Sequence, residues 1–496
     1  MENNFRVEVK NFGAVKDGVF DIKPLTIFIG DNDSGKSYIS KFIYIVVKYL
    51  SQHSNNFLNT LDKKPYENTK IISELNKISS ITNSESQITF TLDEDFINLY
   101  MIDIQKNFTQ IIQKSLEIYF SNNLGDLINI NSKTASIFIY LEFIDIEIII
   151  TNDGKIDLIL KNNKIIKFEL NIYTRVNDTN ESLSMNYGTE NNKISMNISF
   201  NGKLITDIDY LFSKTIEMIF YSKSIFLSFP HSVDYFPANK SGILSNYNTK
   251  FQNSSMSLAT DYIFNNKNMN QDNYIVNDFI QIIQDYSIKK IKENENLTQS
   301  YKYILNSIDG KVHFNENNKL QYKIGNKYNS LDIPIENIST KITELTSIIL
   351  YLKELDKNYL KNFLIIEEPE SHLNPKMQRI MARLIVMMMN EGIQILITTH
   401  SDYILNEMDI LLKLNHIKEK DEKVFDKFID EDKDYESLMA LDRDDLSVYR
   451  FKKEGLDTEI ENIKITKNKV IEKEFEETSE NLYLENSKVI EILKSI

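Results

Sequence analysis

The segment "LTIFIGDNDSGKSYISKFIYIVVKYL", residues 25–50, decides the fold of this chain. Residues 25–29 form a short run of β-branched and aromatic side chains, which is typical of a buried strand. From Ile39 onward, apolar residues recur at helical spacing and would form one face of a helix. Between these two parts, Gly30 is followed after four residues by Gly35-Lys36-Ser37. The segment therefore predicts a strand, a glycine-containing loop and a helix in direct succession.

The loop fits the Walker A pattern, whose chemistry is the binding of phosphate. Glycines let the backbone curl so that N–H groups point inward, and the helix N-terminus adds its dipole toward an anion. Lys36 would reach the β and γ phosphates of ATP, and the Ser37 hydroxyl would coordinate Mg²⁺. The residues expected to contact the nucleotide are Gly30, Asp31, Asn32, Asp33, Ser34, Gly35, Lys36 and Ser37. The alternative is a strand-to-helix turn that holds no ligand.

A second stretch, "LIIEEPESHLNP" at residues 364–375, sets two adjacent carboxylates after an apolar run. Like charges repel, and burying an unpaired charge is costly, so a bound cation would explain the pair. Residues 363–366 read as a buried strand, and ligands bind at the carboxyl ends of parallel strands. Glu367 would support Mg²⁺, and Glu368 would polarise the attacking water as general base. An exposed acidic turn is the alternative.

A helix and a third strand follow this acidic pair. Asn374 can cap the helix, Pro375 suits its first turn and Gly392 suits its end. The next strand, expected over residues 393–397, leads to His400. A histidine at the carboxyl end of a buried strand could contact the γ-phosphate and detect its loss, although many single histidines are ordinary core or surface residues.

These stretches, together with residues 11–37, resemble the ATPase head shared by RecF, SMC proteins and the OLD-type ATPases of the ABC class. The resemblance covers residues 1–50 and 330–410 most closely. It implies an α/β fold of the P-loop NTPase ABC type, in which helices flank a mixed sheet that is interrupted by a large α+β insertion. It is closest to the stand-alone OLD-like and PARIS-type antiphage ATPases. It also assigns a D-loop that begins at Ser371 and a switch role to His400.

Heads of this kind carry a signature motif that completes the ATP site of a neighbouring subunit. The matching place is "NISTKITELTSIILYLKEL", where Ser339 and Thr340 would begin a helix. Both glycines of the usual motif are missing, which resembles the degenerate signature of the stand-alone ATPases. The resemblance implies that Ser339 contacts the nucleotide of a partner, in a homodimer or higher oligomer joined through the ATP sites. An ordinary helix cap is the alternative.

The resemblance divides the chain into three parts. Residues 1–50 and 331–496 would form the head, and residues 51–330 the insertion. Within the insertion we expect strands over residues 135–173, with a hairpin turn at Asn152-Asp153-Gly154, and helices over residues 255–310. The piece "YFPANKSGIL", residues 235–244, resembles a Pro-Ala-x-Arg-Ser segment of such ATPases and would lie near the nucleotide, or it is a simple turn. The charged tract 417–438 is expected to be solvated and mobile.

The composition limits the kind of protein and its partners. A net charge of −15, from 57 basic and 72 acidic residues, argues against a surface that grips nucleic acid everywhere, although a local basic groove remains possible. Cysteine is absent, so the chain has neither disulfides nor thiolate metal sites. No secretory leader or membrane span is recognisable, so we expect a cytoplasmic protein with no membrane partner.

The leading hypothesis for function is Mg²⁺-dependent binding and hydrolysis of ATP that controls dimerisation. The family analogy makes the chain the ATPase or sensor of a prokaryotic antiphage system. No nuclease module is expected after residue 410, so a separate effector chain, a nuclease or a toxin, would carry the killing activity. The alternative is a RecF- or SMC-like ATPase of DNA repair or chromosome maintenance, with nucleic acid as its partner.

Overall fold

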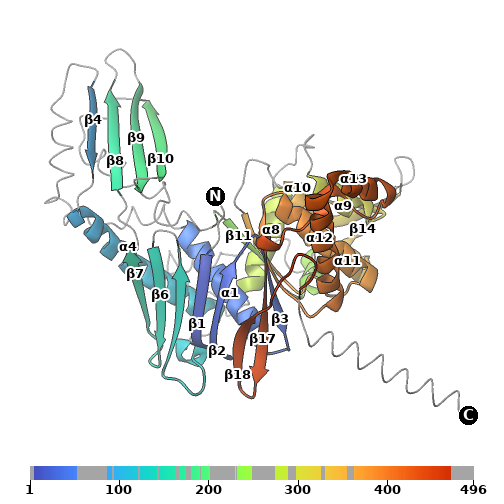
Figure 1. The fold of residues 1–496 in the computed structure, drawn as a ribbon, viewed down its shortest axis with the longest axis horizontal. Coiled ribbons are helices and arrows are strands. Elements are labelled where there is room, and N and C mark those ends of the chain that lie inside the picture. The colour runs from blue at the N-terminus through green and yellow to red at the C-terminus, as the bar shows by residue number, and fades with distance from the viewer. Residues whose placement is uncertain are drawn as a thin grey trace, which may run out of the picture. The chain divides into compact units, whose positions relative to one another are not determined.

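A computed structural model describes most of the chain as two compact units. The described residues are 5–52, 86–91, 94–120, 123–141, 144–162, 167–174, 180–189, 192–201, 230, 232–248, 274–288, 298–325, 330–354 and 362–470. The first unit comprises residues 1–4, 13–44 and 233–496, and the second comprises residues 5–12 and 45–232. Each unit is described by itself (Figure 1).

The first unit is built on one mixed sheet. The order of its strands is β11-β15-β16-β3-β17-β18-β2. The strand bounds are β2 Val15–Ile22, β3 Leu25–Gly30, β11 Ser232–Phe236, β15 Asn362–Glu367, β16 Gln394–Thr398, β17 Leu446–Glu454 and β18 Asp457–Asn462. Strands β15, β16, β3 and β17 pair in parallel, whereas β17 and β18 form an antiparallel hairpin. This arrangement confirms the predicted mixed sheet and its three expected strands.

Strand β3 lies at the centre of this parallel region. Its residues 25–29 are all buried, as the run of apolar and β-branched side chains predicts. The register aligns Glu367 with Thr398 and Thr398 with Phe28. The carboxyl ends of three neighbouring strands therefore open at the same edge of the sheet, and the loops that follow them start close together.

Helices cover this sheet, and those from residue 240 onward share one apolar core with it. Their bounds are α1 Lys36–Gln52, α6 Lys240–Leu244, α8 Tyr274–Ile288, α9 Gln299–Asn306, α10 Thr340–Glu354, α11 Pro375–Asn390, α12 Asp402–Lys420 and α13 Glu422–Glu431. Asn374 caps α11 by accepting a hydrogen bond from the Met377 N–H, and Gly392 follows the helix with a φ of 97°. Both termini agree with the capping signals of the sequence.

The compact unit that carries the Walker A loop includes the chain from residue 233 onward. The sequence predicts that the second part of the head begins at residue 331. The reason that the unit starts earlier lies in the core. Phe236 of β11, Phe279 of α8 and Ile304 of α9 are fully buried in the same cluster as the Walker A strand. A small sheet of β12 Gly310–Phe314, β13 Leu320–Gly325 and β14 Ser330–Pro334 leads from α9 toward α10. In the range 255–310, α8 and α9 bear out the expected helices, and residues 249–273 and 289–297 lie outside the described residues.

The second unit is mainly antiparallel. Its strands are β1 Phe5–Phe12, β4 Ser86–Thr91, β5 Thr134–Tyr140, β6 Ile144–Thr151, β7 Ile156–Asn162, β8 Lys167–Thr174, β9 Asn180–Thr189 and β10 Asn192–Asn201. They form the orders β1-β5-β6-β7 and β10-β9-β8-β4. Helix α4, Glu94–Tyr119, packs on β7. Gly154, with a φ of 76°, turns β6 into β7, which confirms the predicted hairpin.

The charged tract over residues 417–438 is largely exposed, as expected, but most of it is helical. Helix α12 continues to Lys420, and α13 follows directly from an Asp421 cap. Phe425 is buried in the core and Phe428 and Ile429 pack against it, whereas most charged side chains of α13 are exposed. Helices α11, α12 and α13 pack in sequence (Figure 1). Charge density alone therefore does not reveal this helix, because its inner face carries few but well-spaced apolar residues.

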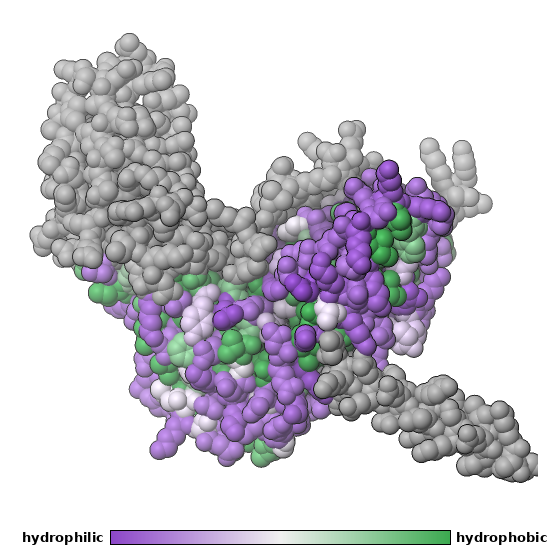
Figure 2. Space-filling view, viewed as in Figure 1, coloured by the Kyte–Doolittle hydropathy of each residue, from purple (hydrophilic) through white to green (hydrophobic). Residues whose placement is uncertain are grey.

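The surface of the described residues is mostly hydrophilic. In the face that Figure 2 shows, apolar side chains gather only in small patches. Val424 and Leu456 are 53% and 72% exposed, and scattered exposed apolar residues of this kind are normal. None of the described helices combines the length and the hydropathy that crossing a bilayer requires.

Candidate nucleotide site

The loop between β3 and α1 has a backbone that only glycine can follow at its ends. Gly30 and Gly35 have φ angles of 132° and 96°, and Asp33 between them has a φ of 59°. A Cβ atom on Gly30 would lie 2.4 Å from the main-chain oxygen of Phe451 on β17. Glycine is therefore required at Gly30 both by conformation and by space. Asp31, Asn32 and Asp33 are exposed, which leaves the outer side of the loop open to a ligand.

The Lys36 side chain folds back over this loop. Its Nζ donates hydrogen bonds to the Gly30 and Asp31 carbonyls, at 2.8 and 2.6 Å, and to Ser34 Oγ at 3.3 Å. Burial lowers the pKa of Lys36 to about 8, although nearby Asp31 and Glu368 favour its charged form. A buried ammonium group held by carbonyl oxygens is a natural place for a phosphate, because anionic oxygens would replace weaker partners.

Glu367 ends β15 with its side chain buried. Its Oε2 accepts a hydrogen bond from the Ala238 N–H at 3.3 Å, whereas its Oε1 has no hydrogen-bond partner among the described residues. Burial, and then the Glu367 carboxylate, raises the pKa of the adjacent Tyr235 well above its usual range. Tyr235 shares a 3.3 Å hydrogen bond with Ser40 of α1. A buried carboxylate oxygen without a partner is costly, and a cation or its water shell would satisfy it.

The residues present therefore fit Mg²⁺. Glu367 supplies an anionic oxygen, and Ser37 is half-buried in the first turn of α1, below the loop. Oxygen donors are the ligands that Mg²⁺ prefers, and it usually keeps water and phosphate oxygens as its other ligands. When bound, the ion would neutralise charge on the phosphates.

Glu368 sits in a strained turn immediately after β15. Its φ is 43°, and its N–H donates to the Thr398 carbonyl at 2.9 Å. Ser371 Oγ donates to Glu368 Oε2 at 3.0 Å, so the first D-loop residue touches the expected base. A non-glycine residue with positive φ is uncommon and is found often at functional sites.

His400 follows β16, and the charges of Lys36, Glu368 and Asp31 act on its imidazole. Burial, and then the Lys36 charge, lowers the pKa of His400, while Glu368 and Asp31 act in the opposite sense. The imidazole is therefore neutral near neutral pH, where it can donate or accept a hydrogen bond. The structure thus brings Lys36, Glu368 and His400 together at one edge of the sheet.

Ser339 is exposed and immediately precedes α10. Its carbonyl accepts hydrogen bonds from the N–H groups of Ile342 and Thr343 at 3.0 and 3.1 Å, as expected for a residue that begins a helix. Ile342, Leu345, Ile349 and Leu352 are buried on one face of the helix, as predicted.

Sequence reasoning did not place Glu370 at this site, and for Lys240 it gave only the resemblance that would set its segment near the nucleotide. Glu370 Oε1 accepts a hydrogen bond from the His400 N–H at 2.7 Å, and burial raises the pKa of Glu370. Lys240 Nζ donates to the main-chain oxygen of Glu367 at 2.9 Å. The segment "YFPANKSGIL" therefore does contact the acidic pair. Glu370 follows Glu368 by two residues in the same acidic stretch. The resemblance to a Pro-Ala-x-Arg-Ser segment pointed to Lys240, but its partner could not be predicted because Glu367 lies far along the chain.

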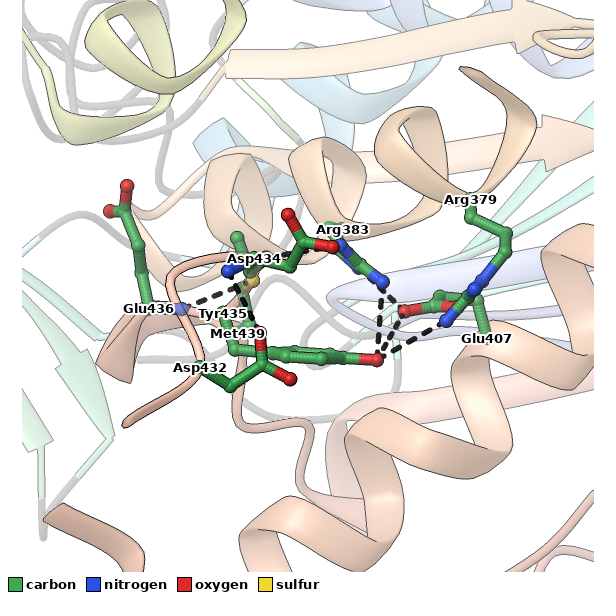
Figure 3. Close-up of polar contacts among 8 residues, drawn as sticks. All are labelled: Arg379, Arg383, Glu407, Asp432, Asp434, Tyr435, Glu436 and Met439. Carbon is green, nitrogen blue, oxygen red and sulfur yellow. Dashed lines mark hydrogen bonds and ion pairs between the residues drawn. The ribbon is translucent and has the colours of Figure 1, made fainter. Parts of the chain in front are cut away.

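The helices that follow the two site strands are joined by a buried ionic cluster (Figure 3). Arg379 and Arg383 of α11 each donate from Nε to Glu407 of α12 at 2.6 Å. The Arg383 guanidinium also lies 4.1 Å from the ring centroid of Tyr435, whose hydroxyl donates to Glu407 at 3.3 Å. The Glu407 side chain is fully buried. This cluster fixes α11 and α12, and with them the turns that carry Glu368 and His400.

Comparison with solved structures finds distant likenesses of fold. An SMC head bound to the C-winged helix domain of ScpA matches with a TM-score of 0.40 at 13% identity, covering 93% of this chain and 98% of that one. The SMC head domain from Thermotoga maritima matches with a TM-score of 0.38 at 10% identity, with the same coverage. At these scores the assignment must rest on sequence families and on the geometry described above.

Comparison with sequences gives one relative and one family model, and the family model carries the assignment. The chain is 25% identical over 329 residues to the Endonuclease GajA of Bacillus cereus strain HuB5-5, a match that covers 60% of this chain and 43% of that protein. The chain thus matches less than half of the length of this relative. The family model described as AAA ATPase domain matches residues 5–405, a range that includes both the Walker A loop and His400. The predicted kinship with P-loop ATPases is confirmed, and the chain belongs to the AAA ATPase domain family.

Proposed function

We propose that this chain binds ATP with Mg²⁺ and hydrolyses it. The observation that carries the proposal is the grouping of Lys36, Glu367 and Glu368 at the edge of the sheet where the parallel strands β3, β16 and β15 end. Lys36 is already aimed at the loop that would hold the phosphates. Glu367 offers a buried carboxylate oxygen without a partner. Family membership supports the same chemistry.

Each residue has a separate part in this proposal. The N–H groups of residues 30–37 and the Lys36 ammonium hold the phosphates. Ser37 and Glu367 hold Mg²⁺, directly or through its water shell. Glu368 orients the attacking water and accepts its proton. Neutral His400 contacts the γ-phosphate and responds to its loss.

The proposal extends to assembly and to the biological role. Ser339 is exposed at a helix start, so its N–H dipole can face the nucleotide of a second copy. ATP would then join two copies, and hydrolysis would release them. The resemblance to the stand-alone OLD-like and PARIS-type ATPases favours a role in antiphage defence beside a nuclease or toxin effector in the cytoplasm, and similarity to an endonuclease is in keeping with a nuclease effector. In a phage-challenge assay, Lys36→Ala should remove the protection that the wild-type chain and its effector provide.

The nucleotide site is tested by calorimetric titration of Mg·ATP into wild-type protein and two variants. Lys36→Ala should abolish hydrolysis and strongly weaken binding, because the phosphates lose their charged donor. Lys41→Ala, further along the same helix, should bind as the wild type does. Circular dichroism must show that both variants are folded. Wild-type affinity in Lys36→Ala would refute the assignment.

A further inference from the structure

Lys240 is a fully buried lysine that contacts the acidic pair from a distant part of the sequence. Its Nζ donates to the main-chain oxygens of Glu367, at 2.9 Å, and of Pro237, at 3.2 Å. Two residues earlier, the Ala238 N–H donates to Glu367 Oε2 at 3.3 Å. The turn between β11 and α6 therefore holds Glu367 at both its main chain and its carboxylate.

The same ammonium group forms an ion pair with α10. Lys240 Nζ lies 2.8 Å from Glu344 Oε1, and the two side chains are 1% and 0% exposed. The Ser241 N–H donates to the other oxygen, Glu344 Oε2, at 3.3 Å. Glu344 lies one turn beyond Ser339, near the start of the helix that the proposed function assigns to the partner's nucleotide. One lysine thus connects the end of β15 with α10.

Stability alone does not account for this pair. Desolvating two charges is costly, and well-packed apolar residues in the same volume are often as stabilising or more so. Glu344 illustrates the cost, because burial raises its pKa even though Lys240 opposes the shift. A buried ammonium group can hold a main-chain oxygen in place through a hydrogen bond, which an apolar side chain cannot do. Here the fixed group is the main-chain oxygen of Glu367.

We propose that Lys240 is a positioning residue that sets Glu367 for the metal and ties its position to the signature helix α10. The proposal rests on the proposed ATPase function. With its main chain and Oε2 both held, Glu367 presents only Oε1 to the ion. Loss of the lysine charge would release the end of β15, and the carboxylate would no longer be fixed where the ion needs it.

The first measurement is the dependence of ATP binding and hydrolysis on Mg²⁺ concentration in the full chain. Partners that orient a metal ligand typically account for about 10–100-fold in metal affinity. In Lys240→Met, the Mg²⁺ concentration for half-maximal turnover should rise by about that factor, while binding of metal-free ATP stays close to wild type. Lys240→Arg keeps the charge and should recover most of the wild-type Mg²⁺ dependence.

A second variant keeps the test decisive if Lys240→Met does not fold. Glu344→Gln keeps the size of the side chain and removes the charge that anchors Lys240 to α10. It should raise the half-maximal Mg²⁺ concentration in the same direction, and it should weaken ATP-dependent dimerisation measured by light scattering. In a folded Lys240→Met/Glu344→Gln double variant, the two effects on Mg²⁺ should not add, because both act through one contact.

The outcomes separate this inference from the function on which it rests. Folded Lys240→Met or Glu344→Gln with wild-type Mg²⁺ dependence would overturn the positioning role. A fall in melting temperature with unchanged Mg²⁺ dependence in the folded protein would assign the pair to stability only, and would also overturn it. If the wild-type chain itself neither binds nor hydrolyses ATP, the proposed function fails instead.

Discussion

Glu370 accepts a hydrogen bond from the main-chain N–H of His400 at 2.7 Å, which joins the turn after β15 directly to the turn after β16. The Glu370 side chain is largely buried, and its second oxygen has no hydrogen-bond partner among the described residues. The turns that carry Glu368, the proposed base, and His400, the proposed switch residue, are therefore linked by a direct hydrogen bond.

Glu370→Ala should uncouple those two turns. His400 would keep its side chain but lose the acceptor that fixes its main chain, and a misplacement of about 1 Å can cost about 10²-fold in rate. We expect hydrolysis to fall by about that factor while ATP affinity changes little, as measured by steady-state turnover and calorimetry. Glu436→Ala, which alters a carboxylate outside the site, serves as the control. Wild-type turnover in Glu370→Ala would show that the contact has no functional role.

The two adjacent carboxylates should respond differently to amide substitution. Glu368→Gln keeps shape but removes the base, so hydrolysis should fall about 10²–10⁴-fold while Mg·ATP binding survives. ATP-bound dimers should then accumulate, visible by light scattering and by retained ATP. Glu367→Gln should weaken the metal-dependent part of binding. If Glu368→Gln weakened Mg·ATP binding while Glu367→Gln bound normally, the roles assigned to the two carboxylates would be wrong.

Nucleotide binding should take up a proton above about pH 8. In the free protein the pKa of Lys36 is about 8, and phosphate charge would raise it, so neutral Lys36 must gain a proton to bind. Affinity should therefore fall as the pH rises from about 7 to about 9. Calorimetry in buffers of different ionisation enthalpy measures the uptake. Lys36→Arg stays charged and should lose this pH dependence, whatever its affinity. If the affinity of the wild-type protein for the nucleotide did not change with pH, the prediction would be wrong.

Assembly through the nucleotide predicts complementation between two inactive variants. Lys36→Ala damages the loop of its own site, and Ser339→Arg damages the helix start that faces the partner's site. A hybrid dimer would keep one site with both parts intact, so mixing the variants should restore part of the turnover. Differently tagged chains show whether hybrids form. Hybrids that form and remain inactive would exclude sharing of a site between copies.

Glu407 should be essential for stability rather than for chemistry. Glu407→Gln leaves two arginines in contact with a neutral group, and breaking a buried ionic cluster in this way costs about 3–5 kcal/mol of unfolding free energy. Denaturant unfolding measures the loss. Lys427→Ala breaks an exposed pair with Glu431, both more than half exposed, and should leave the free energy of unfolding nearly unchanged. Equal stability of the two variants would show that the cluster in Figure 3 contributes little.

The sequence was informative where local rules decide the structure. The Walker A strand, the Asn374 cap and the turn at Gly154 follow from side-chain period, capping and glycine conformation, and the structure bears them out. The packing of residues 233–330 with the head and the contact of Lys240 with Glu367 could not be read in this way. They depend on tertiary neighbours that are distant in sequence, as Lys240 and Glu367 are. Helix α13 was not predicted, because its few inward apolar residues, among them the buried Phe425, stand among many exposed charges.

The packing of Gly30 against the Phe451 carbonyl has a consequence for biosynthesis. Strand β3 pairs with β17 along its whole length, and Ser447 Oγ donates to Thr26 Oγ1 from 421 positions away. During translation, β3 leaves the ribosome long before the strands on either side of it exist. Contacts so distant in sequence form late and slowly. A nascent chain that has not yet reached β17 should therefore not bind ATP, because the strand that packs against the Gly30 end of the loop is still missing.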